Sequence, residues 1–142
     1  MIRVVIDTNV VVSANQIDEG PSAAILSLAI NKNILMFVSA PVLEEYKKVL
    51  NRPRLKIDPV QILGVLVDIR KASEMVTPTR TIEEIKDQPD NRFLECASEA
   101  AADYLVTGNT KHFPQQFENI QIVTPRQFLE FIVPHLIQVR ND

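Results

Sequence analysis

The stretch Ile2-Arg3-Val4-Val5-Ile6-Asp7-Thr8-Asn9, near the N-terminus, decides the fold class. Its first five residues are mostly β-branched and apolar and lack helical spacing, which is typical of a buried strand. The strand stops at Asp7-Thr8-Asn9, residue types that favour turns and helix caps. A buried strand that ends in a polar turn indicates an α/β fold built on a parallel sheet.

Apolar strands and amphipathic helices alternate along the rest of the chain. Further strands are predicted at residues 34–38, 104–107 and 120–123, with a short one near Val76. Helical spacing of apolar residues predicts further helices that begin at Pro21 and after Ser39, and others at about 59–73, 90–101 and 125–132. In the 59–73 helix we expect Ile62, Leu63, Leu66 and Ile69 to face inward.

Length and composition fit a single domain over residues 1–142. The chain has 142 residues, of which 46% are hydrophobic, so it can bury a core without a disulfide or a structural metal. Cys96 is the only cysteine, and the sequence has no zinc-ligand spacing. No apolar run reaches the roughly 18 residues of a membrane span. We therefore expect a soluble, cytoplasmic protein.

Polar side chains follow two of the predicted strands. Asp7 comes directly after the first strand, and Thr107-Gly108-Asn109 directly after the third long one. The carboxyl ends of parallel strands meet at one rim of a doubly wound sheet, which is where such folds bind ligands. Asp103 precedes its strand and belongs to the opposite rim. The rim beside Asp7 is the predicted functional site.

Helical geometry adds two more acids to this rim. Glu45 borders the apolar stripe of the helix after Ser39, whereas Glu44 lies nearly opposite that stripe, so Glu45 is the candidate. Asp90 begins its helix, with Asp87 one turn earlier and Asn91 beside it, and is preferred to Asp87.

Each acid alone has an ordinary explanation, because Asp7 and Asp90 could cap helices and Glu45 could be a surface residue. Together they predict a shared divalent cation, since crowded carboxylates repel each other and raise one another's pKa. Oxygen ligands favour Mg²⁺ or Mn²⁺ over zinc. Such ions activate water and position a phosphodiester, which is nuclease chemistry.

The ordered set of motifs resembles the PIN domain. The resemblance rests on the strand before Asp7-Thr8-Asn9, Ser39 with Glu45, Asp90-Asn91-Arg92-Phe93-Leu94, and Leu105-Val106-Thr107-Gly108. It extends from Met1 to about Phe131. More narrowly, the chain looks like the toxins of toxin–antitoxin systems that are related to the VapC ribonucleases.

This resemblance implies a three-layer sandwich, in which helices cover both faces of a parallel sheet of about five strands. It also implies a Mg²⁺- or Mn²⁺-dependent endoribonuclease, a single-stranded RNA or tRNA substrate, a homodimer and often a small antitoxin partner. Asp7, Glu45 and Asp90 would be metal ligands or orient the attacking water. The supporting positions would be Thr8, Asn9, Ser39, Asn91 and Thr107.

Asn109 completes the implied catalytic set but departs from the family pattern, which often has an aspartate there. An amide oxygen carries no charge and binds a hard cation less strongly than a carboxylate does. The alternative is therefore a catalytically weak or silent PIN fold that binds RNA or a protein.

Basic residues are concentrated in one segment although the net charge is −3. Lys47, Lys48, Arg52, Arg54 and Lys56 would flank Glu45 and could contact RNA phosphates with little sequence preference. The alternative is an ordinary solvated helix face.

Other chemistries are less well supported by the residues. Phosphotransfer on Asp7 in the manner of haloacid dehalogenases needs a second aspartate two residues later, where this chain has Asn9. Receiver domains place their phosphoacceptor on a later strand. We expect structural or surface roles for His112 and His135, and a core position for Cys96.

Overall fold

A computed structural model describes residues 1–86 and 88–141 of the chain. Within these residues the strands form one six-stranded sheet in the order β3-β2-β1-β4-β6-β5. The strands are β1 (Arg3–Ile6), β2 (Leu35–Val38), β3 (Glu74–Met75), β4 (Tyr104–Val106), β5 (Gln116–Phe117) and β6 (Ile120–Val123). Neighbouring strands run parallel except that β5 pairs antiparallel with β6. The predicted parallel α/β sheet is confirmed.

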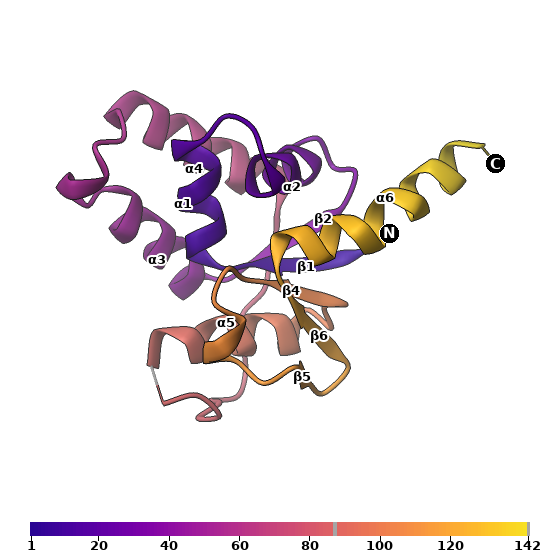
Figure 1. Ribbon diagram of the computed structural model, residues 1–142. Helices are drawn as coiled ribbons and strands as arrows, with labels where there is room; N and C mark the ends of the chain where they lie inside the picture. Colours follow the sequence, from indigo (N-terminus) through magenta and orange to yellow (C-terminus); the bar gives the residue numbers. More distant parts are fainter. Residues whose placement is uncertain (87, 142) are drawn as a thin grey trace.

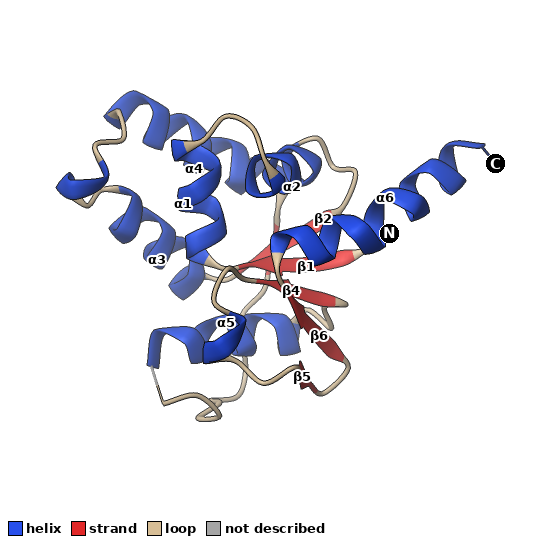
Figure 2. Cartoon of the chain, in the orientation of Figure 1, coloured by secondary structure: helices blue, strands red, loops and turns tan. Residues whose placement is uncertain are grey.

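Helices cover both faces of this sheet (Figures 1 and 2). They are α1 (Thr8–Gln16), α2 (Pro21–Ile30), α3 (Ala40–Leu50), α4 (Pro59–Ala72), α5 (Gln88–Glu99) and α6 (Pro125–Asn141). In the view of Figure 2, α5 lies below β1 and β4, whereas α2 and α6 lie above them. The helices α1, α3 and α4 gather at the end of the sheet where β1 stops. Two short 3₁₀ helices, η1 (Pro53–Leu55) and η2 (Thr110–His112), complete the described elements.

The core follows from the continuous apolar character of the central strands. Val4, Val5 and Ile6 of β1 are fully buried because the strand is covered on both faces. Tyr46 of α3 is also fully buried, and its hydroxyl donates a hydrogen bond to the carbonyl oxygen of Ile6. This bond compensates for burying the hydroxyl, and burial raises the pKa of Tyr46 well above its usual value. The same hydrogen bond attaches α3 to the carboxyl end of β1.

Some local predictions were wrong. Residues 8–16, expected to begin as a turn, form α1, whose Val10 and Val11 are buried. Leu63 is 65% exposed, and Val65 packs inward in its place. Ala101 has a φ of 49°, which places it beyond the end of α5 rather than on the helix's buried side.

The expected core position of Cys96 is confirmed. Cys96 is fully buried, and burial raises the pKa of its thiol to about 12. Asp103 lies at the opposite rim, where its carboxylate accepts a hydrogen bond from the backbone N–H of Arg3 at 2.8 Å. Across the described residues, no helix has both the length and the apolar character needed to cross a bilayer.

Candidate functional site

A cavity of about 480 Å³ opens where β1 and β4 end. The two strands are parallel, with Ile6 paired to Val106, so their last residues emerge side by side. The polar residues that line it are Asp7, Thr8, Asn9, Ser13, Gln16, Glu45, Arg52, Arg54, Asp90, Asn109 and His112. We call it the acidic cavity. It brings together Asp7, Glu45, Asp90 and Asn109, which the sequence predicted to converge.

Asp7 is both a helix cap and a cavity residue. Its backbone is extended, with φ −68° and ψ 154°, and its Oδ1 accepts the N–H of Thr8 at 2.7 Å at the start of α1. Its Oδ2 accepts the hydroxyl of Thr107 at 2.7 Å and the amide of Asn9 at 3.2 Å. The side chain is therefore held in one orientation toward the cavity, although Asp7 is only 4% exposed.

The environment of Asp7 raises its pKa above the usual 3.8. Burial is the largest cause, because it disfavours the charged form. Hydrogen bonds from Thr107, Thr8 and Asn9 lower the pKa, while the negative charge of Glu45 raises it. Asp7 is thus a carboxylate whose charge is poorly compensated by the protein itself.

Thr107 and Asn9 connect the two strand ends. The hydroxyl of Thr107, which is fully buried, accepts the N–H of Asn109 at 3.0 Å and the amide of Asn9 at 3.4 Å. The side-chain oxygen of Asn9 accepts the N–H of Gly108 at 2.8 Å. A Cβ at Gly108 would lie 3.2 Å from this oxygen, so glycine permits the close approach. The network fixes Asn109 at the rim of the cavity.

Glu45 comes from α3, which begins at Ser39. The hydroxyl of Ser39 accepts the N–H of Val42 at 3.3 Å and so caps the helix. Glu45 is half-buried and lines the acidic cavity, whereas Glu44 is exposed. The prediction that Glu45, rather than Glu44, lies at the cavity is confirmed. Ser39 is buried away from the cavity and positions the helix that carries Glu45.

Asp90 lies in the first turn of α5 and is half-buried against the cavity. Asn91 points elsewhere, because its amide donates to the carbonyl of Ile85 at 2.6 Å and its oxygen accepts the N–H of Ile85 at 2.8 Å. Asn91 therefore braces the segment before α5. Asp87, the rejected alternative, falls outside the described residues.

His112, for which the sequence predicts a structural or surface role, lines the acidic cavity. Its Nδ1 lies 3.7 Å from Oδ2 of Asp90. Asn109 directly precedes η2 and His112 ends it, so the two residues are three apart, and residues at this spacing align in a 3₁₀ turn. The spacing of His112 from Asn109 could have identified it as a cavity residue from the sequence. This inference needs the 3₁₀ turn after β4, which the sequence does not predict.

The predicted basic segment contributes in part. Arg52 and Arg54, on either side of Pro53, line the acidic cavity. Lys47, Lys48 and Lys56 are exposed and are absent from the described residues that line it. The two arginines thus give a cavity rich in carboxylates a positively charged edge.

The donor chemistry fits a hard divalent cation. Asp7, Glu45, Asp90 and Asn109 offer carboxylate and amide oxygens, the ligands that Mg²⁺ prefers. Among the described residues, however, no three His, Cys, Asp or Glu side chains are placed to hold one ion together. Mg²⁺ commonly keeps several of its waters and binds through one or two carboxylates, so this spacing suits a partly hydrated ion.

The chain is similar to known proteins over most of its length. An uncharacterized protein of the archaeon Methanocaldococcus jannaschii is 28% identical in an alignment that covers 91% of this chain and 90% of the archaeal one. Residues 3–111 match the family model described as PIN domain, a family whose members are generally nucleases that use divalent metals. This match contains Asp7, Glu45, Asp90 and Asn109, and the chain therefore belongs to the PIN domain family.

Proposed function

We propose that the acidic cavity is the active site of a Mg²⁺- or Mn²⁺-dependent endoribonuclease that hydrolyses RNA phosphodiester bonds. The observation that carries the proposal is the meeting of Asp7, Glu45 and Asp90, from separate elements, in one cavity edged by arginines. Family membership supports it, because PIN domains are generally nucleases.

Asp7, Glu45 and Asp90 would hold a partly hydrated ion, one or two of these carboxylates as direct ligands and the rest through its waters, with Asn109 as a neutral donor beside them. When bound, the ion supplies Lewis-acid chemistry that acidifies water and offsets charge on the leaving oxygen. The chain itself orients Asp7 through the Thr107 hydroxyl. Arg52 and Arg54 bind the phosphates on either side of the cleaved bond, because guanidinium groups suit phosphate oxygens.

The test is a cleavage assay on single-stranded RNA and on tRNA with Mg²⁺ or Mn²⁺, with and without a chelator. We expect internal cleavage that the chelator abolishes and that fails in Asp90→Asn. Activity that persists in Asp90→Asn and Asp7→Asn alike would place the chemistry elsewhere or in a contaminant.

The proposed contact between Arg54 and RNA phosphates can be tested by measuring RNA affinity and its dependence on salt. Replacing Arg54 with alanine should weaken RNA binding at all sequences and lower the slope of log affinity against log salt by about 1. Titrations at several salt concentrations measure both quantities. Lys71→Ala, an exposed cation at the end of α4 outside the cavity lining, is the matched control. Equal slopes for both variants would contradict a phosphate contact by Arg54.

A catalytically silent PIN fold that binds RNA or a protein is the second candidate, and the observation that favours it is Asn109. A carboxylate at this place would add a charged donor at the rim of the cavity. We expect Asn109→Asp to bind Mn²⁺ more tightly, by roughly tenfold. Calorimetric titration measures the change. Unchanged affinity would show that Asn109 does not contact the ion, and no binding by the unaltered protein at millimolar Mn²⁺ would favour the silent fold.

The cellular part of the proposal is that this ribonuclease is the toxin of a toxin–antitoxin system, acts in the cytoplasm and is inhibited by a small antitoxin protein. A homodimer belongs to the same proposal. Its support is the exposed apolar series Val60, Leu63 and Val67 along α4, which lies on the helical hairpin of α3 and α4. A small upstream reading frame that encodes an antitoxin-like protein would support the toxin role.

A further inference from the structure

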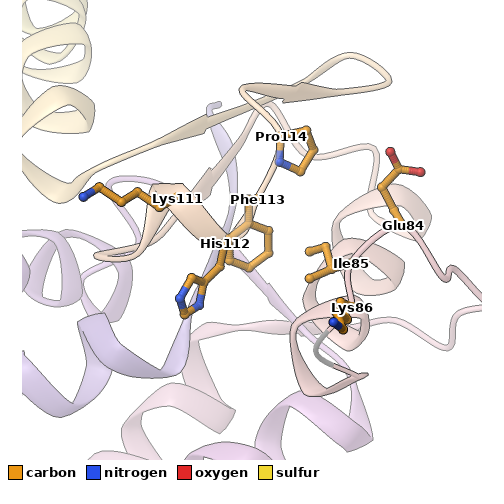
Figure 3. A pocket seen from close by; sticks show the side chains of 7 residues that line it. All are labelled: Glu84, Ile85, Lys86, Lys111, His112, Phe113 and Pro114. Atoms are coloured by element: carbon orange, nitrogen blue, oxygen red, sulfur yellow. The ribbon is translucent and has the colours of Figure 1, made fainter.

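A second cavity of about 560 Å³ lies beside the acidic one, and we call it the side cavity. It is lined by Glu84, Ile85, Lys86, Lys111, His112, Phe113 and Pro114 (Figure 3). This volume falls within the roughly 300–1,000 Å³ typical of small-ligand sites. The mechanism above gives this cavity no role.

His112 belongs to the lining of both cavities. On one side its Nδ1 lies 3.7 Å from Asp90, and on the other Figure 3 shows its ring next to Phe113. The side chain of His112 is 56% exposed, so a planar ring is presented to a ligand at the junction. Among the described residues that line the two cavities, His112 is the one that both linings share.

The side cavity combines an apolar wall with two lysines and one glutamate, Glu84. Ile85 and Phe113 are each 8% exposed and form the apolar wall with Pro114. Lys86 and Lys111 are exposed and carry positive charge at the cavity. In Figure 3 Phe113 and Ile85 occupy the middle of the group, and Lys111 extends away from them. Planar and apolar surface beside lysines is the combination with which proteins bind single-stranded nucleic acid.

We propose that the side cavity binds the base of the nucleotide next to the cleaved phosphodiester, stacked on the imidazole ring of His112. Lys86 and Lys111 contact the neighbouring phosphates. The inference rests on the proposed function, because it takes the acidic cavity as the place of the scissile phosphate. It makes the substrate an unpaired stretch of RNA, since a base held in a duplex cannot enter a side cavity.

The test compares oligoribonucleotides of one sequence that each carry a single abasic residue at a different position. Binding is measured by fluorescence anisotropy with a chelator present and at low salt, so that no cleavage is needed. For the unaltered protein we expect one abasic position to weaken binding at least about fivefold, because stacking of one base is lost. His112→Ala should remove this dependence on position.

Two variants separate stacking from other roles of His112. His112→Phe keeps a flat ring without the imidazole nitrogens and should retain the dependence on position, while Lys71→Ala should leave it unchanged. Equal affinity for the whole oligonucleotide set would overturn the inference and would leave the side cavity to a protein ligand. A dependence on position that survives in His112→Ala would overturn it as well.

These outcomes are distinguishable from those of the cleavage assay. Cleavage by a protein that shows no dependence on the abasic position would refute the base site and leave the ribonuclease in place. Dependence on position without any cleavage would support the base site and refute the hydrolytic function.

Discussion

Replacing Asp7 with asparagine is expected to slow RNA cleavage at least about a hundredfold and to change how the free energy of unfolding depends on pH. The loss of activity follows because a metal centre contributes several kcal/mol to stabilising the transition state, and about 1.4 kcal/mol corresponds to tenfold in rate. The introduced asparagine side chain would still offer an oxygen to the N–H of Thr8, so the start of α1 keeps its cap.

The change in the pH dependence of the free energy of unfolding follows from the raised pKa of Asp7. A carboxyl group whose pKa is higher in the folded than in the unfolded protein favours folding less as the pH rises from its unfolded value through its folded value. Asp7 starts from 3.8, and burial moves it upward. The unaltered protein without metal should therefore lose stability relative to Asp7→Asn as the pH rises above about 4.

Urea unfolding of both proteins in the presence of a chelator, at pH values from 3 to 8, measures this difference. Adding Mn²⁺ at neutral pH should stabilise the unaltered protein more than the variant, because a ligand that binds the folded state raises its stability. If the difference in stability between the two proteins does not change with pH, the charge of Asp7 is compensated better than its burial indicates.

Replacing Thr107 with valine is expected to lower the free energy of unfolding by about 1–3 kcal/mol and to shift the pH dependence of cleavage. Valine has nearly the same shape but no hydroxyl. Oδ2 of Asp7 loses the 2.7 Å hydrogen bond, and the N–H of Asn109 loses its acceptor at 3.0 Å. Buried polar groups left without partners cause the loss of stability.

The same change should raise the pKa of Asp7, because the hydrogen bond from Thr107 is the largest influence that lowers it. Ionised Asp7 then appears only at higher pH, so the acidic limb of the cleavage profile should move upward in pH. Thr107→Ser keeps the hydroxyl and should restore the position of this limb even if it restores stability incompletely. An unmoved limb in Thr107→Val would mean that another group controls the acidic side of the profile.

Elements with regular patterns could be predicted from the sequence. β1 and β4 are covered on both faces, and they are therefore short, continuous apolar runs that can be recognised in the sequence. The ends of these two runs predicted the rim of the sheet at which Asp7 and Thr107 meet. The helical period separated Glu45 from Glu44 without any tertiary information. By contrast, the valines of residues 10–12 suit a strand as well as a helix, so α1 was not recognised.

The placements that the sequence could not predict depend on contacts between distant segments. His112 reaches the acidic cavity from η2, an element too short to show a periodic pattern. Ser39 and Asn91 belong to the motif that resembles the family but are buried as braces of α3 and of the segment before α5. A motif identifies residues that the fold requires, yet it does not separate those that face a ligand from those that hold other residues in place.

The two edges of the sheet have a consequence for behaviour at high concentration. β3 and β5 are each two residues long, so each edge offers few unpaired backbone groups on which the strand of another molecule could build. Longer interior strands such as β1 and β2 are paired on both sides within the chain. The short edge strands therefore disfavour edge-to-edge pairing of sheets from different molecules. Association between copies would then involve the side chains of the helices.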